Sequence, residues 1–467
     1  MSTRPTSDES DEHRDRSIRL SVLTSLLSKF GTIILRLVSI PIAIRVLGME
    51  QFGVYTAITL FVALIDILHV GIGPTLTKEL SKAIAKGRRR REQTVFATGV
   101  ILSTGLTVIG VGIAASLLLL FPVTTLFGAE YKDVADTMIT ALWVGLAISA
   151  LDIFTTPFEM SRDGYMETRF TNSWGAAGNL LAAITLVSGI WFFPTIEFLL
   201  ISVNGITVLA KVGNSVHLLI QRPYLIPRPS LFKKELVKPL VVDSGLFSIT
   251  YILSAIIEYH LMVFLIGRFV GPQAVAVFNV MITIHLSLNG VMAMFTKPYW
   301  PALMNAFERK DRPWILNSSK QLAFLGLGFS AAVAAGLVLL GPIVLPLWAG
   351  ADFINAAPAG FVMNRLALAA FSLYFAAHAW RHIGQTLALG AAPVNCVAKV
   401  IFAESAFILC AASFILTSTG NITLIYLAMA VGMMCFSGWL FPRIFLKGLK
   451  SDSMHEPDAP DSVSIPV

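Results

Sequence analysis

Five cationic side chains lie inside long apolar stretches of this sequence, where a charge is costly. They are Lys29, Arg36, Lys211, Arg365 and Lys399. An ionisable group at the centre of a lipid bilayer costs about 2.5–3.5 kcal/mol on insertion scales, so each one needs a physical reason. Fixed positive charges suit the binding of an anion, and an arginine can hold a phosphate through two parallel hydrogen bonds. These five residues are therefore candidates for an anion-binding site.

Lys29 and Arg36 form the most informative pair because they are seven residues apart. On an α-helix this spacing returns to the same face, about 10 Å further along the axis. Lipid accepts a helix face with two cations poorly, so we expect this face to line a cavity. The alternative for Lys29 is that its long side chain reaches the inner membrane surface.

Two of the other cations leave alternatives open. Lys211 could bind the same anion, or it could form an internal ion pair with Asp152 or Asp66. Arg365 could receive an anion near the outer surface, or it could contact the phosphates of outer lipids. The sequence does not decide between a binding role and a structural role for either side chain.

A second group of ionisable residues in apolar stretches could bind a proton or another coupling ion. They are Asp66, Asp152, Glu258, His260 and Glu404. Histidine titrates near neutral pH, and burial can raise the pKa of a glutamate toward the same range. Glu258 and His260 could form a proton-responsive cluster with His285, for which the alternative is an ordinary core histidine.

Composition indicates what surrounds these charges. The chain has 467 residues, of which 55% are hydrophobic and only 13% are charged, whereas a soluble domain carries about 25% charged residues. Apolar stretches of about 20 residues predict transmembrane helices, because an open sheet would leave backbone groups unpaired in lipid. We expect an all-α polytopic membrane protein. Its twelve predicted helices cover residues 20–44, 52–73, 95–121, 137–160, 171–193, 197–220, 243–267, 273–296, 321–347, 359–380, 391–416 and 422–446.

Lysine and arginine predict the orientation. They crowd into alternate connections, whereas the remaining connections offer only Arg45, Lys132 and Arg268. The basic segments are 1–19, 74–94, 161–170, 221–242, 297–320, 381–390 and 447–467. The positive-inside rule places these segments and both termini in the cytoplasm, with the chain in the cytoplasmic (inner) membrane. The first 19 residues are polar and the following apolar run is long, so we expect no cleavable signal peptide.

A short sequence occurs twice, half a chain length apart. RVLGMEQFGVY at 45–55 and RFVGPQAVAVF at 268–278 each follow the first helix of a predicted group of six. An even number of helices keeps the same orientation, so the repeat is parallel. The predicted organisation is a tail (1–19), a six-helix bundle (20–220), a cytoplasmic linker (221–242), a second six-helix bundle (243–446) and a tail (447–467). Two such bundles are typical of transporters that work by alternating access.

The motifs also resemble a known family. The turn formed by Leu47, Gly48, Phe52, Gly53 and Tyr55, followed by GIGPTLTKE at 71–79, resembles the Wzx-type flippases. These form the polysaccharide-transport branch of the multidrug/oligosaccharidyl-lipid/polysaccharide (MOP) exporter superfamily. Where the family tends to have an aspartate two residues before the first glycine of the second motif, this chain has His69.

The resemblance implies a MATE-like fold and a flippase function. Members move polyprenyl-pyrophosphate-linked oligosaccharides, such as O-antigen or exopolysaccharide repeat units, to the outer leaflet. The implied partners are this substrate, membrane lipids and the polysaccharide polymerase machinery. H⁺ or Na⁺ could be a coupling ion, but the sequence does not decide whether H⁺, Na⁺, the membrane potential or the substrate gradient drives transport. The cavity cations would then hold the pyrophosphate.

Other functions are less compatible with the sequence. It has no P-loop and no HExxH motif, and its outer connections are too short for a catalytic domain, so we expect a transporter and not an enzyme. The three cysteines lie in apolar runs, so we predict no disulfide, metal site or cofactor. The basic run at 87–91 is expected to contact anionic lipids, not nucleic acid. A cation-coupled multidrug antiporter is the main alternative, and a non-transporting scaffold would leave the buried charges without a reason.

Overall fold

The computed structural model describes residues 7–65, 72–238, 256–296, 310–350, 364–392 and 394–450, together with positions 240, 299, 303, 306 and 307. The described part of the chain is helical and contains no β-strand, which confirms the predicted fold class. The chain divides into two compact units, described separately below. Unit 1 comprises residues 1–280 and 345–358, and unit 2 comprises residues 281–344 and 359–467.

Unit 1 begins with the long helix α1 (Ser7–Ala63), which is broken at Gly48. Gly48 has φ 84° and ψ 165°, a conformation that a residue with a side chain rarely adopts. The break lies within the predicted connection between the first two helices. The repeated motif therefore contains a helix break made possible by its glycine.

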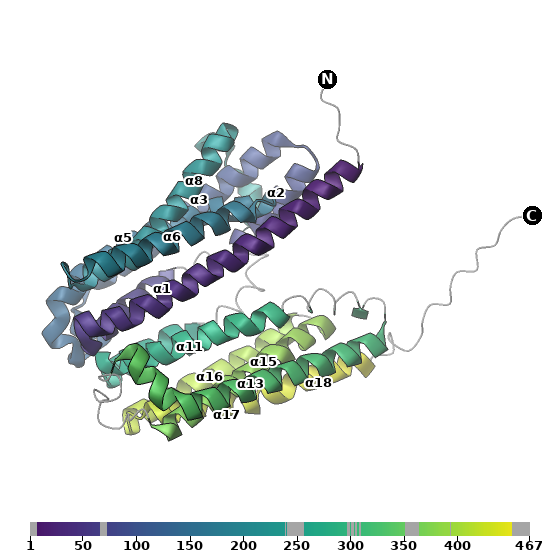
Figure 1. The fold of residues 1–467 in the computed structure, drawn as a ribbon. Helices are drawn as coiled ribbons and strands as arrows, with labels where there is room; N and C mark the ends of the chain where they lie inside the picture. Colours follow the sequence, from purple (N-terminus) through teal and green to yellow (C-terminus); the bar gives the residue numbers. More distant parts are fainter. Residues whose placement is uncertain are drawn as a thin grey trace, which may run out of the picture. The chain divides into compact units, whose positions relative to one another are not determined.

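The remaining helices of unit 1 follow in chain order (Figure 1). They are α2 (Ile72–Ala85), α3 (Arg89–Leu120), α4 (Val123–Phe127), η2 (Ala129–Val134), α5 (Ala135–Gly164), α6 (Thr168–Gly189), α7 (Ile196–Leu199), η3 (Leu200–Gly205), α8 (Ile206–Gln221), η4 (Pro223–Leu225), η5 (Pro229–Leu231), η6 (Lys234–Leu236), η8 (Ile256–Leu261), α10 (Met262–Phe269) and the start of α11 (Pro272–Thr296). The predicted break near Pro194 is present, because α6 ends at Gly189 and α7 begins after the capping residue Thr195.

Small residues allow α1 and α6 to pack closely. A side-chain carbon added at Gly31 would lie 3.5 Å from Asn179 Cβ, and the Asn179 amide donates a hydrogen bond to Thr32 Oγ1 at 2.9 Å. One turn further along α1, Leu35 is buried against Ala182 and Ala183. This face of α1 therefore packs against α6, and the other faces of α1 do not take part in this contact.

The two copies of the repeated motif contact each other within unit 1. A Cβ atom added at Gly53 would lie only 1.8 Å from the carbonyl oxygen of Pro272. Close by, the Asn279 amide donates a hydrogen bond to Thr56 Oγ1 at 3.0 Å. The glycine in the first copy thus permits the backbone of the second copy to approach.

Unit 2 contains the rest of α11, α13 (Arg312–Ala349) as far as residue 344, and the helices α15 (Arg365–Ala391), α16 (Val394–Ser418), α17 (Ile422–Cys435) and α18 (Ser437–Lys450). Several helix boundaries differ from the prediction. In unit 1, α2 (Ile72–Ala85) lies mostly within the expected connection 74–94, and in unit 2 a second expected connection is helical. Residues 381–390 were expected to form a cytoplasmic connection, but α15 continues through them to Ala391. The reason is local, since AWRHIGQTLALGA contains no proline and no cap to end the helix.

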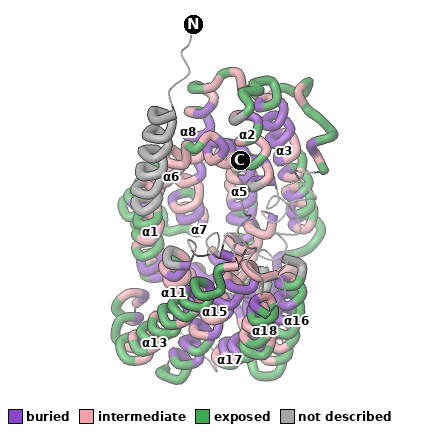
Figure 2. Tube along the Cα trace, turned by 90° about the vertical axis from the view of Figure 1, so that its right-hand side faces the viewer, coloured by how far each residue is buried: buried purple, intermediate pink, exposed green. Residues whose placement is uncertain are grey.

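The surface is suited to lipid. Eight described helical segments are long and apolar enough to span a membrane. Figure 2 shows many exposed positions along the helices. Large apolar side chains are among them, for example Leu120, Phe324 and Leu339. In water such a surface would aggregate, and in a bilayer it is the expected exterior.

Candidate functional site

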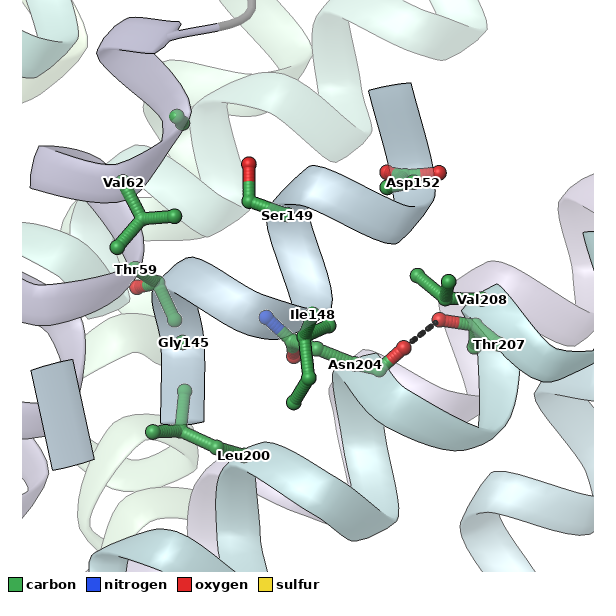
Figure 3. A pocket seen from close by; sticks show the side chains of 11 residues that line it. Thr59, Val62, Gly145, Ile148, Ser149, Asp152, Leu200, Asn204, Thr207 and Val208 are labelled. Carbon is green, nitrogen blue, oxygen red and sulfur yellow. Dashed lines mark hydrogen bonds between the residues drawn. The ribbon is translucent and has the colours of Figure 1, made fainter. Parts of the chain in front are cut away.

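A polar pocket lies inside unit 1. Its empty volume is about 570 Å³. Figure 3 shows the lining side chains converging from α1, from α5 and from the η3–α8 segment. The residues are Thr59, Val62, Ala63, Gly145, Ile148, Ser149, Asp152, Leu200, Asn204, Thr207 and Val208. Hydroxyl, amide and carboxylate groups therefore face a shared space within an apolar bundle.

Local sequence explains how the helices present these groups. On α5, Gly145, Ile148, Ser149 and Asp152 follow the helical spacing of three, four and seven residues, so they share one face. Gly145 allows α1 to approach, because an added Cβ would lie 3.2 Å from Ile58 Cγ2. The pocket is thus built where two helices come close without large side chains between them.

The side of the pocket formed by the η3–α8 segment contains a π-helical turn. Residues Leu200–Gly205 form η3, and two of them, Leu200 and Asn204, line the pocket. π-Helical turns are rare, and they are frequent at functional sites. The sequence carries no signal for this turn, so Asn204 is not predictable as a pocket residue from the sequence.

The structure decides between the alternatives for Lys211. Lys211 Nζ lies 2.6 Å from Asp152 Oδ1 and 3.9 Å from Glu159 Oε2. The internal ion pair with Asp152 is therefore present at the edge of the pocket. With both carboxylates ionised, these three groups carry one net negative charge.

Arg36 is connected to the pocket through Tyr55. The two side chains are close enough to interact electrostatically, and the Tyr55 hydroxyl donates a hydrogen bond to Asn204 Oδ1 at 3.1 Å. Asn204 in turn lines the pocket. A cation on α1 is thereby linked to a pocket residue on the distant η3 turn within one bundle.

The face of α1 that carries Arg36 is distinct from the face on which large apolar side chains are exposed. Phe30, Ile34 and Leu37 are all at least half exposed, and they lie about 100–160° around the helix from Arg36. Ile40 and Ala43, one and two turns further along the Arg36 face, are buried. Lys29 and Arg36 are themselves exposed. Further toward the C-terminal end of α1, the same face is buried in the bundle.

The candidate coupling residues of unit 1 lie in different places. Glu258 is buried, with 1% of its surface exposed. His260 makes a hydrogen bond with the backbone of Leu60 and lines a smaller, mainly aromatic cavity of about 300 Å³ beside Phe127 and Tyr131. Both residues lie on the π-helical turn η8. Asp66 lies outside the described residues.

In unit 2, Glu404 has partners that sequence reasoning missed. Its Oε1 accepts a hydrogen bond from Arg381 at 2.7 Å, and its Oε2 accepts one from the backbone nitrogen of Ser437 at 3.1 Å. Arg381 had been assigned to a cytoplasmic connection, but it is 94% buried within α15. Arg365 and Lys399 are exposed. The signal that could have identified Arg381 is an unbroken helical pattern through that segment.

A polar network closes one end of unit 1. The fully buried Arg162 donates to Asn214, Glu167 and Gln221, and Arg222 also donates to Glu167, at 2.7 Å. Burial acts to raise the pKa of Glu167, but hydrogen bonds and charges from Arg222 and Arg162 outweigh it and lower this pKa. The network joins α5, α6 and α8 and is suited to a structural role.

No group of three metal-ligating side chains occurs within the described residues. The side chains that line the pocket offer hydroxyl and amide groups and one carboxylate, that of Asp152. These groups can bind a hydroxyl-rich molecule, and Lys211 lies next to the pocket in its ion pair with the lining residue Asp152.

Comparison with known proteins agrees with this architecture. Residues 19–306, more than half of the chain, match the family described as "Polysaccharide biosynthesis protein". No curated protein sequence matches significantly.

Among solved structures, the chain is similar to an inward-facing multidrug resistance MATE family transporter of the MOP superfamily, with 16% identity, a TM-score of 0.70, and coverage of 90% of this chain and 96% of that one. It is also similar to a MOP superfamily transporter from Pyrococcus furiosus whose binding pocket is described as having reverse polarity (15% identity, TM-score 0.64, coverage 95% and 97%). A third is the Vibrio cholerae MATE transporter VcmN in its bent form (16% identity, TM-score 0.59, coverage 95% and 99%). At these identities the likeness establishes the fold, which is that of the MOP superfamily.

Proposed function

Because this chain belongs to the polysaccharide biosynthesis protein family, we propose that it is a flippase for a polyprenyl-pyrophosphate-linked oligosaccharide. The substrate would be a repeat unit of a cell-surface polysaccharide, such as O-antigen or exopolysaccharide. The protein would sit in the cytoplasmic (inner) membrane with both termini in the cytoplasm, and it would work by alternating access.

The observation that carries this proposal is the polar pocket, to which Arg36 is connected through Tyr55 and Asn204. Sugars are recognised through their hydroxyl groups, and Thr59, Ser149, Asn204 and Thr207 offer hydroxyl and amide partners in one space. A drug-sized apolar ligand would need few of these groups. The lining therefore favours a hydroxyl-rich substrate.

Arg36 is the best candidate for the pyrophosphate. Crossing a low-dielectric slab is costly for an anion, and a fixed guanidinium lowers this cost through charge and bidentate hydrogen bonding. Lys211 is already occupied by Asp152, so Arg36 would act first and Lys29, one step along the same face, would act with it. Arg365 and Lys399, both in unit 2, are proposed as later contacts.

Energy for transport would come from H⁺ or Na⁺. Asp66, Asp152, Glu258, His260 and Glu404 remain the proposed ion-coupling residues, since each is a titratable or cation-binding group in an apolar stretch. Membrane lipids and the polysaccharide polymerase machinery are the proposed partners.

The second candidate function is a cation-coupled multidrug antiporter. It is favoured by the excess carboxylate beside Lys211, because Asp152 and Glu159 together outnumber that single cation. A cationic drug would be attracted to such a site.

Deletion of the gene distinguishes the two functions. We expect lipid-linked glycan to accumulate on the inner leaflet and surface polysaccharide to disappear. Increased drug sensitivity with normal surface glycan would favour the antiporter instead.

Substitution tests the role of Arg36. Arg36→Ala should abolish surface glycan at normal expression, whereas Arg36→Lys should retain part of it because the charge remains. The matched control is Arg443→Ala, which removes an exposed arginine that stacks on Trp439 and should leave surface glycan unchanged. Full activity of Arg36→Ala would remove this residue from the substrate path.

A further inference from the structure

One sequence offset recurs in three hydrogen bonds of unit 1. The first joins Asn279 to Thr56, which are 223 residues apart, and this is also the offset between the two copies of the repeated motif. In a structure built from two equivalent halves, a residue contacts its own equivalent only near the two-fold axis that relates them. The bond between Thr56 and Asn279 therefore places the pseudo-two-fold axis of the repeat at the contact between the two motifs.

The arginines that begin the two motifs make the other two bonds. Arg45 Nη2 donates to the carbonyl oxygen of Leu347 at 3.0 Å, and Arg268 Nη1 donates to that of Thr124 at 3.2 Å. The same 223 residues separate Thr124 from Leu347 and Arg45 from Arg268. The two contacts are thus equivalent under the repeat. In each, an arginine from one predicted half (20–220 or 243–446) binds a helix end from the other half.

The local sequence explains why both acceptors are at helix ends. Leu347 lies in the last turn of α13, and Thr124 lies in the last turn of α4. Carbonyl groups in the last turn of a helix can accept hydrogen bonds from donors outside it. A glycine with positive φ follows each helix, Gly350 at 101° and Gly128 at 126°. Both helices therefore stop where an arginine can reach their last carbonyl groups.

A second bond on the Arg45 side runs in the opposite direction. Trp348 Nε1 donates to the carbonyl oxygen of Leu37, in α1, at 2.9 Å. Leu37 is four residues before Pro41, which has no N–H, so this carbonyl lacks its usual partner within the helix. An unpaired carbonyl is costly in a membrane. The indole of Trp348 satisfies it, so α1 and the last turn of α13 each donate to the other.

The position of these bonds suggests what they do. All of them lie within unit 1, and both motifs and both helix ends belong to connections that the positive-inside rule places on the outer side. Alternating access requires the halves of a repeat to separate at one end while they stay together at the other. We propose that Arg45 and Arg268 form a paired latch, which holds the outer ends of the two halves together and releases before the transporter opens outward. The outward direction rests on the proposed function and orientation.

The strength of the latch suits a bond that breaks in every cycle. Both arginines are exposed, so water can replace the carbonyl groups when they release. A hydrogen bond of this kind favours the closed state by a factor of about five, and two independent ones by a factor of about 25. A buried ion pair in the same place would hold the halves more tightly and would oppose opening.

Distances in the purified protein test the latch without any substrate. Spin labels are placed on Asp136→Cys and Thr419→Cys, at exposed positions near the predicted outer ends of the two halves. The three native cysteines are replaced by serine, and distances are measured by pulsed electron paramagnetic resonance in lipid nanodiscs. The ratio of outer-open to outer-closed molecules should rise about fivefold in Arg45→Ala or Arg268→Ala and about 25-fold in the double variant.

Lys132→Ala is the matched control. It also removes an exposed cation from the predicted outer side, and it should leave the ratio unchanged. Arg45→Lys and Arg268→Lys keep a donor, so they should restore part of the closed population. An increase in Lys132→Ala equal to that of the double alanine variant would mean that outer charge alone sets the ratio, and it would overturn the proposal.

A second pair of labels separates release of the latch from general loosening. Arg90→Cys and Lys447→Cys mark exposed positions near the predicted inner ends of the two halves. These labels should approach each other in the double alanine variant as the outer labels separate. Unchanged distances at both ends, or separation at both ends, would overturn the proposal. If the double variant does not fold, the two single variants provide the same test.

The test is independent of the identity of the substrate. If gene deletion leaves surface glycan unchanged, the flippase function is refuted, but the label distances still decide whether the latch exists. If deletion removes surface glycan and the distances do not change in the arginine variants, the latch is refuted and the flippase function stands.

Discussion

Replacing Gly53 with alanine tests the contact between the two copies of the repeated motif. The added Cβ would lie 1.8 Å from the carbonyl oxygen of Pro272 and 2.5 Å from its carbonyl carbon. Real Cβ atoms almost never come closer than 3.0 Å to another heavy atom, so the backbones must separate by at least 1.2 Å, the difference between 3.0 and 1.8 Å. The struck atom belongs to the backbone, so it cannot rotate away as a flexible side chain would.

The energetic cost follows from overpacking. Forcing extra volume into a packed core typically costs about 1–3 kcal/mol and occasionally more. A backbone clash of this size belongs at the upper end, about 3 kcal/mol, which corresponds to a factor of about 150 in the folding equilibrium. We expect Gly53→Ala to lower the apparent melting temperature of the purified protein, measured by tryptophan fluorescence and by the monodisperse fraction in size-exclusion chromatography.

Gly105→Ala is the matched control. Gly105 is also a helical glycine, on α3, but an added Cβ there would have no heavy atom within 4 Å. Alanine is favoured over glycine inside a helix by about 0.5–1 kcal/mol, so this variant should melt at or slightly above the temperature of the wild type. A Gly53→Ala protein as stable as the wild type would refute the close approach of residues 53 and 272.

Two further predictions concern the polar network at the end of unit 1. Arg162→Ala should destabilise the purified protein by about 1–3 kcal/mol, because it leaves the hydrogen-bond acceptors of Asn214 and Gln221 without the guanidinium. Arg162→Lys should recover only part of this loss. A melting temperature equal to that of the wild type would contradict the role assigned to the guanidinium. The lowered pKa of Glu167 predicts that its stabilising contribution is complete above the unfolded value of about 4.3 and is lost as the pH falls through the folded value. Glu167→Gln should remove this acid-dependent loss, so equal acid sensitivity in thermal melts of wild type and variant would argue against it.

The architecture could be predicted from the sequence because it depends on long-range averages. The length of an apolar run predicts a membrane-spanning helix, and the glycine at position 48 marks a place where the backbone can adopt a positive φ. The spacing of the repeated motif predicts the repeat of helices. The helix break at Gly48 therefore falls in the predicted connection. The boundary at 381 was wrong because a positive-inside count treats every arginine near a span as exposed, whereas Arg381 is buried against Glu404.

The partners of the buried charges could not be predicted in the same way. Asp152 and Lys211 are 59 residues apart, and Tyr55 and Asn204 are 149 apart. Such pairs depend on helix rotation and on tertiary packing, which hydrophobic periodicity specifies only to within a broad stripe. Sequence reasoning named Lys211 and Asp152 but left their pairing open, and it did not identify Asn204 or Arg381.

The turn from Leu200 to Gly205 holds one residue more than a regular α-helical turn would. If the same residues wound as a regular α-helix instead, this extra residue would rotate everything after the turn by about 100° relative to what comes before. Asn204 and Thr207 would leave the pocket together, and Lys211 would turn away from Asp152, although no named side chain had been replaced. The winding of this one short segment therefore decides which side chains face the pocket as much as the identity of any residue in it does.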